Sequence, residues 1–258
     1  MTGPDVLVVT SGDNPQFKAL RRLAQDNTAY RKAARVWIEG DHLCRAALAR
    51  GVKPTLAVFS SSLWPLAPRD WHATASKTLV LSDALWRALS ALESPAQMGF
   101  VIELPAPVLI AARQATVILD RVQDAGNVGS ILRSASAFGF GQVIALTGTA
   151  ALWSPKVLRA GMGAHFGLRL IEGAELSDLD ALSLPLLVTS SHQGEYLQQA
   201  VLPMPCAWAL GHEGQGVCAQ LKQRASLAIR IAQPGGEESL NVAAAAAICL
   251  HACACRTG

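Results

Sequence analysis

Five polar side chains stand where apolar segments of the sequence give way to glycine-rich or helix-starting stretches. They are Asn127 and Arg133 in residues 119–140, Glu213 in residues 206–217, and Ser239 and Asn241 in residues 229–247. A guanidinium group within two turns of a helix start is well placed to meet a phosphate. Glycines beside such groups let the backbone approach a ligand closely, because no β-carbon intrudes. The set therefore indicates a polar binding or catalytic site.

Each segment taken alone also has an ordinary structural explanation. Arg133 lies off the apolar stripe of its predicted helix, and most arginines are simply solvated. Glu213 would suit an exposed tight turn between glycines. Ser239 and Asn241 are residue types that cap helices, and the alanine run after them allows close helix packing. The chemical interpretation depends on the three segments lying together.

Several nucleotide-binding and hydrolase motifs are missing from the sequence. The glycine clusters do not fit G-x-G-x-x-G, since Gly139 and Gly141 precede a predicted strand and the glycines from 211 to 216 lack the close first pair. No G-x-x-x-x-G-K-[ST] or G-x-S-x-G occurs, and the HEGQG at 212–216 lacks the second histidine of H-E-x-x-H. The sequence therefore gives no support for a P-loop protein, a dinucleotide-binding protein or a hydrolase of a common type.

The elements that must position these side chains form an α/β pattern. From Ala115 onward, short apolar runs alternate with helical patterns, which is typical of a parallel sheet covered on both faces. Strands are expected at 115–120, 142–146, 167–171, 184–191, 206–214 and 226–232, and helices at 127–138, at 154–163 and from Glu238. The polar segments follow the ends of such strands, so they are expected at one edge of the sheet.

The N-terminal third predicts a second, smaller α/β unit. Helices are expected near 15–25, at 41–50 and from Ser82, and strands at 35–39, 55–60, 78–81 and 100–103. Residues 104–113, with prolines at 105 and 107, are the best linker candidate.

The positive charge of the chain is concentrated in its N-terminal part. Residues 1–104 hold 12 Lys and Arg against 9 Asp and Glu, whereas residues 105–258 hold 10 of each. The excess lies mainly between Phe17 and Lys53, and a basic cluster of this kind suits a polyanion. A solvated pair of helix faces is the alternative explanation.

Composition argues against a membrane, secretory or metal-binding protein. The longest apolar run, Val242–Leu250, is too short to cross a bilayer, and the first residues lack the basic start and cleavage site of a secretory signal. A cytoplasmic location is expected. The six cysteines include no C-x-x-C, and Cys249 and Cys253 are expected to be packed thiols on one helix face, so no metal is predicted.

Taken together and in this order, the three segments resemble the motifs of the SpoU/TrmH family of SPOUT methyltransferases. The matching positions are Asn127, Gly129, Arg133 and the Ala-Phe-Gly of 137–139, then GHEGQG at 211–216 and SLNV at 239–242. The segment at 154–168 is also similar, and residues 14–103, with IEG at 38–40, look like the RNA-binding domain of many members. Ala125 replaces a usual proline and Ser134 a common threonine.

The resemblance implies methyl transfer from S-adenosylmethionine to an RNA ribose 2′-hydroxyl. Arg133 would be closest to the departing proton, as a positioning charge or together with an RNA phosphate, because arginine is a poor free base. Asn127, Glu213, Ser239 and Asn241 would position the ribose and Arg133. By the same resemblance, the cofactor-binding residues are Thr189, Leu210, Gly211, Ile231 and Leu240.

The resemblance also implies the architecture and the partners. It predicts a small α/β RNA-binding domain at 1–104, a linker at 105–114, and at 115–258 a parallel-sheet SPOUT domain with a deep trefoil knot. Members are homodimers with the active site near the subunit interface. The RNA, ribosomal rather than transfer RNA, would be held by the N-terminal domain through Arg21, Arg22, Arg31 and Lys32.

Two other functions are weighed against this one. A non-catalytic RNA-binding or ribosome-assembly protein with the same fold would be expected to have lost Arg133, Glu213 or Asn241, and all three are present. A small-molecule α/β enzyme would leave the basic cluster and the three-motif set unexplained.

Overall fold

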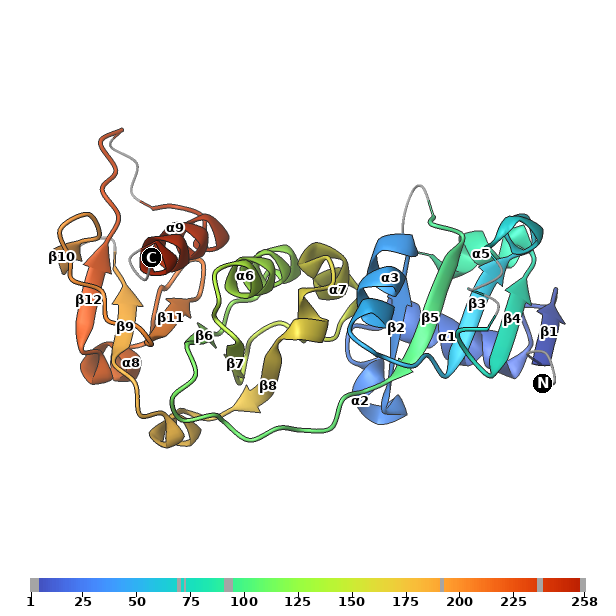
Figure 1. Ribbon diagram of the computed structural model, residues 1–258, viewed down its shortest axis with the longest axis horizontal. Helices are drawn as coiled ribbons and strands as arrows, with labels where there is room; N and C mark the ends of the chain where they lie inside the picture. Colours follow the sequence, from blue (N-terminus) through green and yellow to red (C-terminus); the bar gives the residue numbers. More distant parts are fainter. Residues whose placement is uncertain are drawn as a thin grey trace. The chain divides into compact units, whose positions relative to one another are not determined.

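The computed structural model describes residues 5–68, 71, 73–90, 95–190, 193–235 and 239–255 of the 258-residue chain. It divides into two compact units, each built around its own sheet (Figure 1). The first unit comprises Met1–Ala106 and Trp153–Phe166, and the second Pro107–Leu152 and Gly167–Gly258. Among the described residues, no helix combines the length and apolar character that crossing a bilayer requires.

The first unit is a five-stranded mixed sheet with helices. Its strand order is β1-β4-β3-β5-β2, in which β1, β4 and β3 are parallel while β5 runs antiparallel to both β3 and β2. The elements of this unit are β1 Asp5–Val9, α1 Pro15–Gln25, α2 Ala29–Ala33, β2 Arg35–Glu39, α3 Asp41–Ala49, β3 Leu56–Ser60, η1 Trp64–Leu66, β4 Lys77–Leu81, α5 Asp83–Leu89, β5 Met98–Glu103, α7 Pro155–Gly161 and η2 Ala164–Gly167.

The second unit is a seven-stranded sheet in which every pairing is parallel. Its strand order is β10-β12-β9-β11-β6-β7-β8. The elements are β6 Thr116–Asp120, α6 Ala125–Ala137, β7 Gln142–Leu146, β8 Arg169–Ala174, η3 Leu176–Ala181, β9 Leu186–Thr189, β10 Glu195–Tyr196, β11 Ala207–Gly211, α8 Ala219–Arg224, β12 Leu227–Arg230 and α9 Val242–Ala254.

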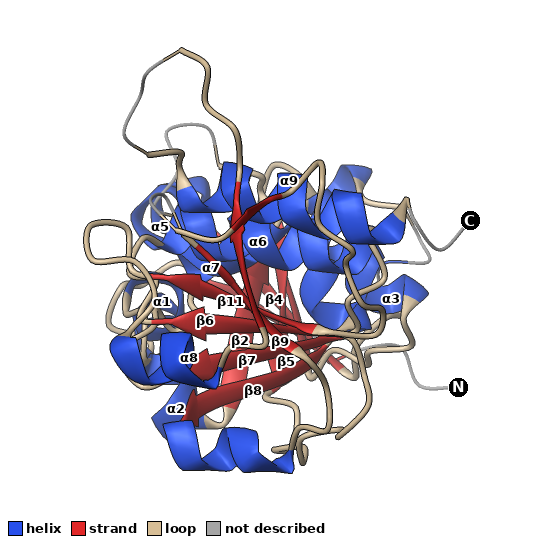
Figure 2. Ribbon diagram, turned by 90° about the vertical axis from the view of Figure 1, so that its left-hand side faces the viewer, coloured by secondary structure: helices blue, strands red, loops and turns tan. Residues whose placement is uncertain are grey.

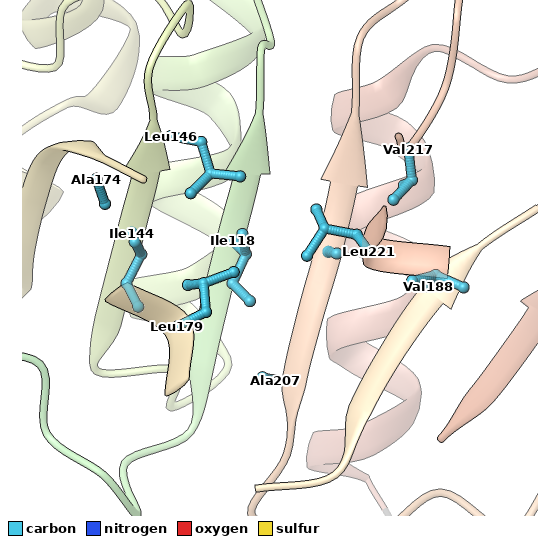
Figure 3. Close-up of a cluster of buried hydrophobic side chains, with 10 residues drawn as sticks. Ile118, Ile144, Leu146, Ala174, Leu179, Val188, Ala207, Val217 and Leu221 are labelled. Atoms are coloured by element: carbon cyan, nitrogen blue, oxygen red, sulfur yellow. The ribbon is translucent and has the colours of Figure 1, made fainter. Parts of the chain in front are cut away.

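Both faces of the central strands of this sheet are covered, as the continuous apolar runs predict. Every residue of β6, β7 and β11 is buried. On one face, Ile118, Ile144 and Ala209 belong to a cluster that includes Leu179 of η3 and Leu221 of α8 (Figure 3). The other face is covered by α6 and α9, which lie side by side (Figure 2).

Two cysteines of helix α9, Cys249 and Cys253, are buried where the helix covers the sheet. Trp208 of β11 is fully buried, and its indole Nε1 donates a hydrogen bond to Cys253 Sγ at 3.2 Å. Cys249 is buried on the same helix. The prediction that these cysteines are packing residues is therefore confirmed.

Most elements expected from the sequence are present within three residues of the expected bounds. The expected start of the last helix was wrong: α9 begins at Val242, because Asn241 caps it, and Ser239 and Leu240 lie outside any helix, while Glu238 lies outside the described residues. The structure adds several short elements that the sequence pattern did not indicate, namely β1, α2, η1, η2, η3, β10 and α8.

Candidate active site

The polar segments meet at the carboxyl edge of the parallel sheet in the second unit. Strands β6 and β11 pair in register so that Asp120 lies opposite Gly211, the last residue of each strand. The loop after β6 leads into α6, and the turn after β11 carries Glu213. Helix α9 begins beside them, since Asn241 bonds to a residue of α6. This edge is where open α/β sheets generally bind ligands.

Glu213 accepts hydrogen bonds from the loop between β6 and α6. Its carboxylate oxygens accept from the backbone N–H groups of Gln123 at 3.2 Å and Asp124 at 3.1 Å, and from Asn127 Nδ2 at 3.1 Å. Burial alone would raise the pKa of Glu213, but the hydrogen bonds from Asn127, Asp124 and Gln123 outweigh it and lower this pKa. The carboxylate is therefore ionised at neutral pH. Its contribution to stability is present above the unfolded-state pKa and is lost as the pH falls through the lowered pKa.

The charge of Glu213 and the N–H groups at the start of α9 together fix the orientation of two amides. An ionised carboxylate only accepts hydrogen bonds, so the amide nitrogen of Asn127 must face it. Asn127 Oδ1 then accepts from Asn241 Nδ2 at 2.9 Å. Asn241 Oδ1 in turn accepts from the N–H groups of Ala243 and Ala244 at the start of α9. One directed chain of hydrogen bonds thus joins three segments that are far apart in the sequence.

Local geometry explains why α6 and α9 begin where they do. Asp124 caps α6 by accepting the N–H of Asn127 at 2.8 Å, and Asn241 caps α9. Both caps therefore lie within the hydrogen-bonded cluster. The backbone of Asn127 is held by the cap of α6, and the side chain of Asn241 is held by the start of α9.

Residues 212–217, which we term the glycine turn, fold back against the end of β11. A β-carbon on Gly211 would lie 2.1 Å from Gly216 C and from Val217 N, so no side chain fits at that position. His212 pairs with Gly216 in an isolated bridge, and His212 Nδ1 accepts from the N–H groups of Gly214 and Gln215. The glycines let the turn lie directly against the strand.

A cavity of about 550 Å³ opens between the glycine turn, the ends of β9 and β12, and the start of α9. This size is within the range of small-molecule and cofactor sites. Its lining combines apolar side chains, backbone of the glycine turn and a few polar groups. The lining residues include Thr189, Gly211, Glu213, Gln215, Ile229, Ile231, Gln233, Ser239, Leu240 and Asn241.

The sequence-predicted residues fall into three groups in the structure. Glu213, Ser239 and Asn241 line the cavity and Asn127 bonds to two of them, while Thr189, Gly211, Ile231 and Leu240 also line it. Leu210 is fully buried and is not part of the lining. Arg133 is exposed on α6, two turns along from Asn127, and lies outside the lining of this cavity.

The four basic residues predicted to bind RNA lie in the first unit. Arg21 and Arg22 are exposed on α1, and Arg31 and Lys32 are exposed on α2, which packs against α1. Lys18, Arg21 and Arg22 also line a shallow depression of about 360 Å³ on α1.

Sequence reasoning missed Asp120 and Arg121 at the end of β6. Asp120 is 2% exposed, accepts the Cys218 N–H at 2.6 Å and forms an ion pair with Arg121 Nε at 2.8 Å. Burial alone would raise the pKa of Asp120, but the hydrogen bonds from Arg121 and Cys218 outweigh it and lower this pKa. The only indication in the sequence was that two charged residues, Asp120 and Arg121, directly follow the apolar run of the predicted strand.

The fold and the cavity define an α/β protein with a ligand site at the carboxyl edge of a parallel sheet. A family model described as the SpoU rRNA Methylase family matches residues 114–251. The chain is also 32% identical, over 83% of its length and 86% of the relative, to the 23S rRNA (guanosine(2553)-2′-O)-methyltransferase RlmP of Bacillus subtilis. The protein therefore belongs to the SpoU rRNA methylase family.

Solved structures resemble the whole chain. An AdoMet-bound rRNA methyltransferase from Sinorhizobium meliloti matches with a TM-score of 0.84 and 25% identity, over 98% of each chain. An RNA 2′-O ribose methyltransferase matches with a TM-score of 0.79 and 29% identity, over 97% of this chain and 98% of the other.

The contact between Asn127 and Glu213 gives a pH-dependent prediction. Asn127→Asp places a second carboxylate about 3 Å from the first, so the folded variant should hold a shared proton with a raised pKa. Its stability deficit relative to wild type should therefore grow as the pH rises, to about 1–3 kcal/mol at pH 8. Denaturant unfolding at pH 5 and pH 8 measures the deficit. Asn127→Ala, which adds no charge, should lose the same amount at both pH values. An equal deficit for Asn127→Asp at both would contradict the proposed pairing.

Proposed function

We propose that the protein transfers the methyl group of S-adenosylmethionine to a ribose 2′-hydroxyl of structured RNA, with ribosomal RNA favoured over transfer RNA. The observation that carries the proposal is the hydrogen-bond chain from Asn241 through Asn127 to Glu213 at the rim of a cofactor-sized cavity. Membership of the family and the names of the relatives support the same reaction.

The cavity fits S-adenosylmethionine in size and chemistry. Its apolar side includes Ile231 and Leu240, and the glycine turn offers backbone groups where Gly211 leaves no room for a β-carbon. Thr189 adds a hydroxyl at the end of β9. Leu210, buried behind the lining, would contribute through its backbone. When bound, the cofactor supplies an already activated methyl group, so the protein mainly has to align the acceptor and help it lose a proton.

Asn127, Glu213, Ser239 and Asn241 would align the ribose. Glu213 is held ionised and Asn127 and Asn241 are held in one orientation, so these groups are arranged before the substrate binds. Ser239 is exposed at the cavity and offers a hydroxyl. Preorganisation of this kind lowers the cost of reaching the reactive geometry.

Arg133 would assist proton loss as a positioning charge, alone or with an RNA phosphate. It is exposed and outside the cavity of its own chain. We propose that the protein is a homodimer and that Arg133 acts near the subunit interface. The exposed side of α9 supports a dimer. Apart from His251 this helix is apolar around its circumference, yet Ala244 and Ile248 are exposed on it. A helix of this composition is normally covered on all sides.

We further propose that residues 1–104 bind the RNA, that residues 105–114 link them to the methyltransferase domain of residues 115–258, and that the protein works in the cytoplasm. The basic faces of α1 and α2 support the first point, since they offer a cluster of exposed cations to a polyanion. The trefoil knot implied by the family resemblance stays a prediction.

Calorimetric titration with S-adenosylmethionine tests the cofactor, and one variant tests the chemistry. Arg133→Ala should lower kcat by at least about 100-fold, the scale of lost proton-transfer assistance, while leaving the Kd for S-adenosylmethionine within about twofold because Arg133 lies outside the cavity. Arg113→Ala removes another exposed arginine of the same unit as a control. Unchanged turnover of Arg133→Ala would assign the arginine to the solvated surface. A wild-type protein that binds RNA but no cofactor would favour the assembly role.

The basic cluster gives a salt-dependence prediction. Replacing Arg21, Arg22, Arg31 and Lys32 together by glutamine should weaken RNA binding and reduce the slope of log K against log[salt] by up to about 3. Filter binding across a salt series measures both quantities. Lys77→Gln with Arg87→Gln, two exposed charges elsewhere in the same unit, is the control. An unchanged slope in the fourfold variant would mean that other residues hold the RNA.

A further inference from the structure

Arg121 holds a backbone conformation that its residue type rarely adopts. It directly follows β6 with φ at +58°, in the left-handed region. Glycine occupies this region at no steric cost, whereas a residue with a β-carbon is strained there. A non-glycine residue at positive φ beside a functional site is a reason to ask what its side chain does.

The guanidinium group of Arg121 bridges the end of β6 and the glycine turn. Nε donates to Asp120 Oδ1 at 2.8 Å, and Nη1 donates to Gln215 Oε1 at 3.0 Å. The side-chain stem packs on the turn after β7, where a β-carbon on Gly148 would lie 3.1 Å from Arg121 Cγ. The side chain of Arg121 thus reaches from the end of β6 to the glycine turn.

An interior residue of the glycine turn and the residue just after the turn are both tied to this pair. Gln215, which accepts from Arg121, also lines the cavity. Just beyond the turn, the Cys218 N–H donates to Asp120 Oδ2 at 2.6 Å. The Asp120 carboxylate is itself 2% exposed, so it has little access to water and depends on these donors. Arg121 and Asp120 together hold the turn from within the chain.

We propose that Arg121 is a positioning residue that keeps the glycine turn in the shape required for cofactor binding. It acts through Gln215 and Asp120. The inference rests on the proposed function, in which the same cavity holds S-adenosylmethionine.

The variant Arg121→Gly separates this role from a general role in folding. Glycine relieves the left-handed backbone, which offsets part of the stability lost with the ion pair between Arg121 and Asp120, so the variant should remain folded while the bridge to Gln215 is lost. The Kd for S-adenosylhomocysteine, measured by calorimetry, should rise on the order of tenfold, the factor expected for one hydrogen bond to a charged group. In the ligand-free protein, the amide hydrogens of Gln215 and Cys218 should exchange faster. Arg121→Lys, whose ammonium group cannot reproduce the planar fork, should bind more weakly than wild type as well.

A matched control and a double variant make the outcome decisive. Gln97→Gly makes the same backbone change at φ +57°, in the first unit, and should leave cofactor affinity unchanged. In a Gln215→Ala background, Arg121→Gly should cost less than it does alone, because the bridge is already broken.

Wild-type affinity and wild-type exchange in Arg121→Gly would overturn the proposal, as would weakened RNA binding with unchanged cofactor affinity. A wild-type protein that binds no cofactor would instead overturn the proposed function. The exchange rates of the ligand-free turn would still confirm or refute that Arg121 holds it.

Discussion

The carboxylate of Glu213 is the point at which the polar side chains of the site meet. It accepts two backbone N–H groups and one amide N–H from the loop that starts α6, and its lowered pKa keeps it an acceptor at neutral pH. Because its charge is fixed, the amides of Asn127 and Asn241 each have one satisfied orientation. Without this charge, the amide nitrogen of Asn127 would lose its acceptor, and only the N–H groups at the start of α9 would still orient the chain of hydrogen bonds.

The parallel sheet supplies the frame for this interaction. Strands β6 and β11 are adjacent and end in register at Asp120 and Gly211, so the two loops that follow them emerge side by side. The apolar strands are buried on both faces, which leaves their carboxyl ends as the place where polar groups can gather. Segments almost a hundred residues apart in the sequence are thereby brought within hydrogen-bonding distance.

Much of this arrangement could be predicted from the sequence, and the limits have physical causes. Apolar runs such as 116–120 and 207–211 predicted parallel strands, and polar residues after strand ends predicted a common edge. The start of α9 was misplaced because the residues before Asn241 are acidic and polar, as a first helical turn often is, and only the geometry identifies Asn241 as the cap. Strand β1, an edge strand with mostly exposed residues, was missed although residues 6–9 form an apolar run that is typical of a strand.

The site residues were easier to predict than the residues that support them. Glu213 and Asn241 belong to motifs of a family that the sequence resembles. Arg121, in contrast, is notable only for its backbone angle, and a φ value cannot be read from a residue type. The exposed position of Arg133 follows from the apolar stripe of α6, because Arg133 lies off the buried face of that helix.

The double use of Asn241 narrows the choice of residue at the start of α9. Serine, threonine, aspartate and asparagine all cap helices well. Aspartate would accept the N–H groups of Ala243 and Ala244 but offers no donor to Asn127 Oδ1, while the shorter hydroxyl side chains cannot extend a second polar group in the opposite direction. Of these four residues, only asparagine can accept hydrogen bonds from the helix start and also donate one in the opposite direction. A helix cap that is also part of a binding site therefore accepts one residue type where an ordinary cap accepts four.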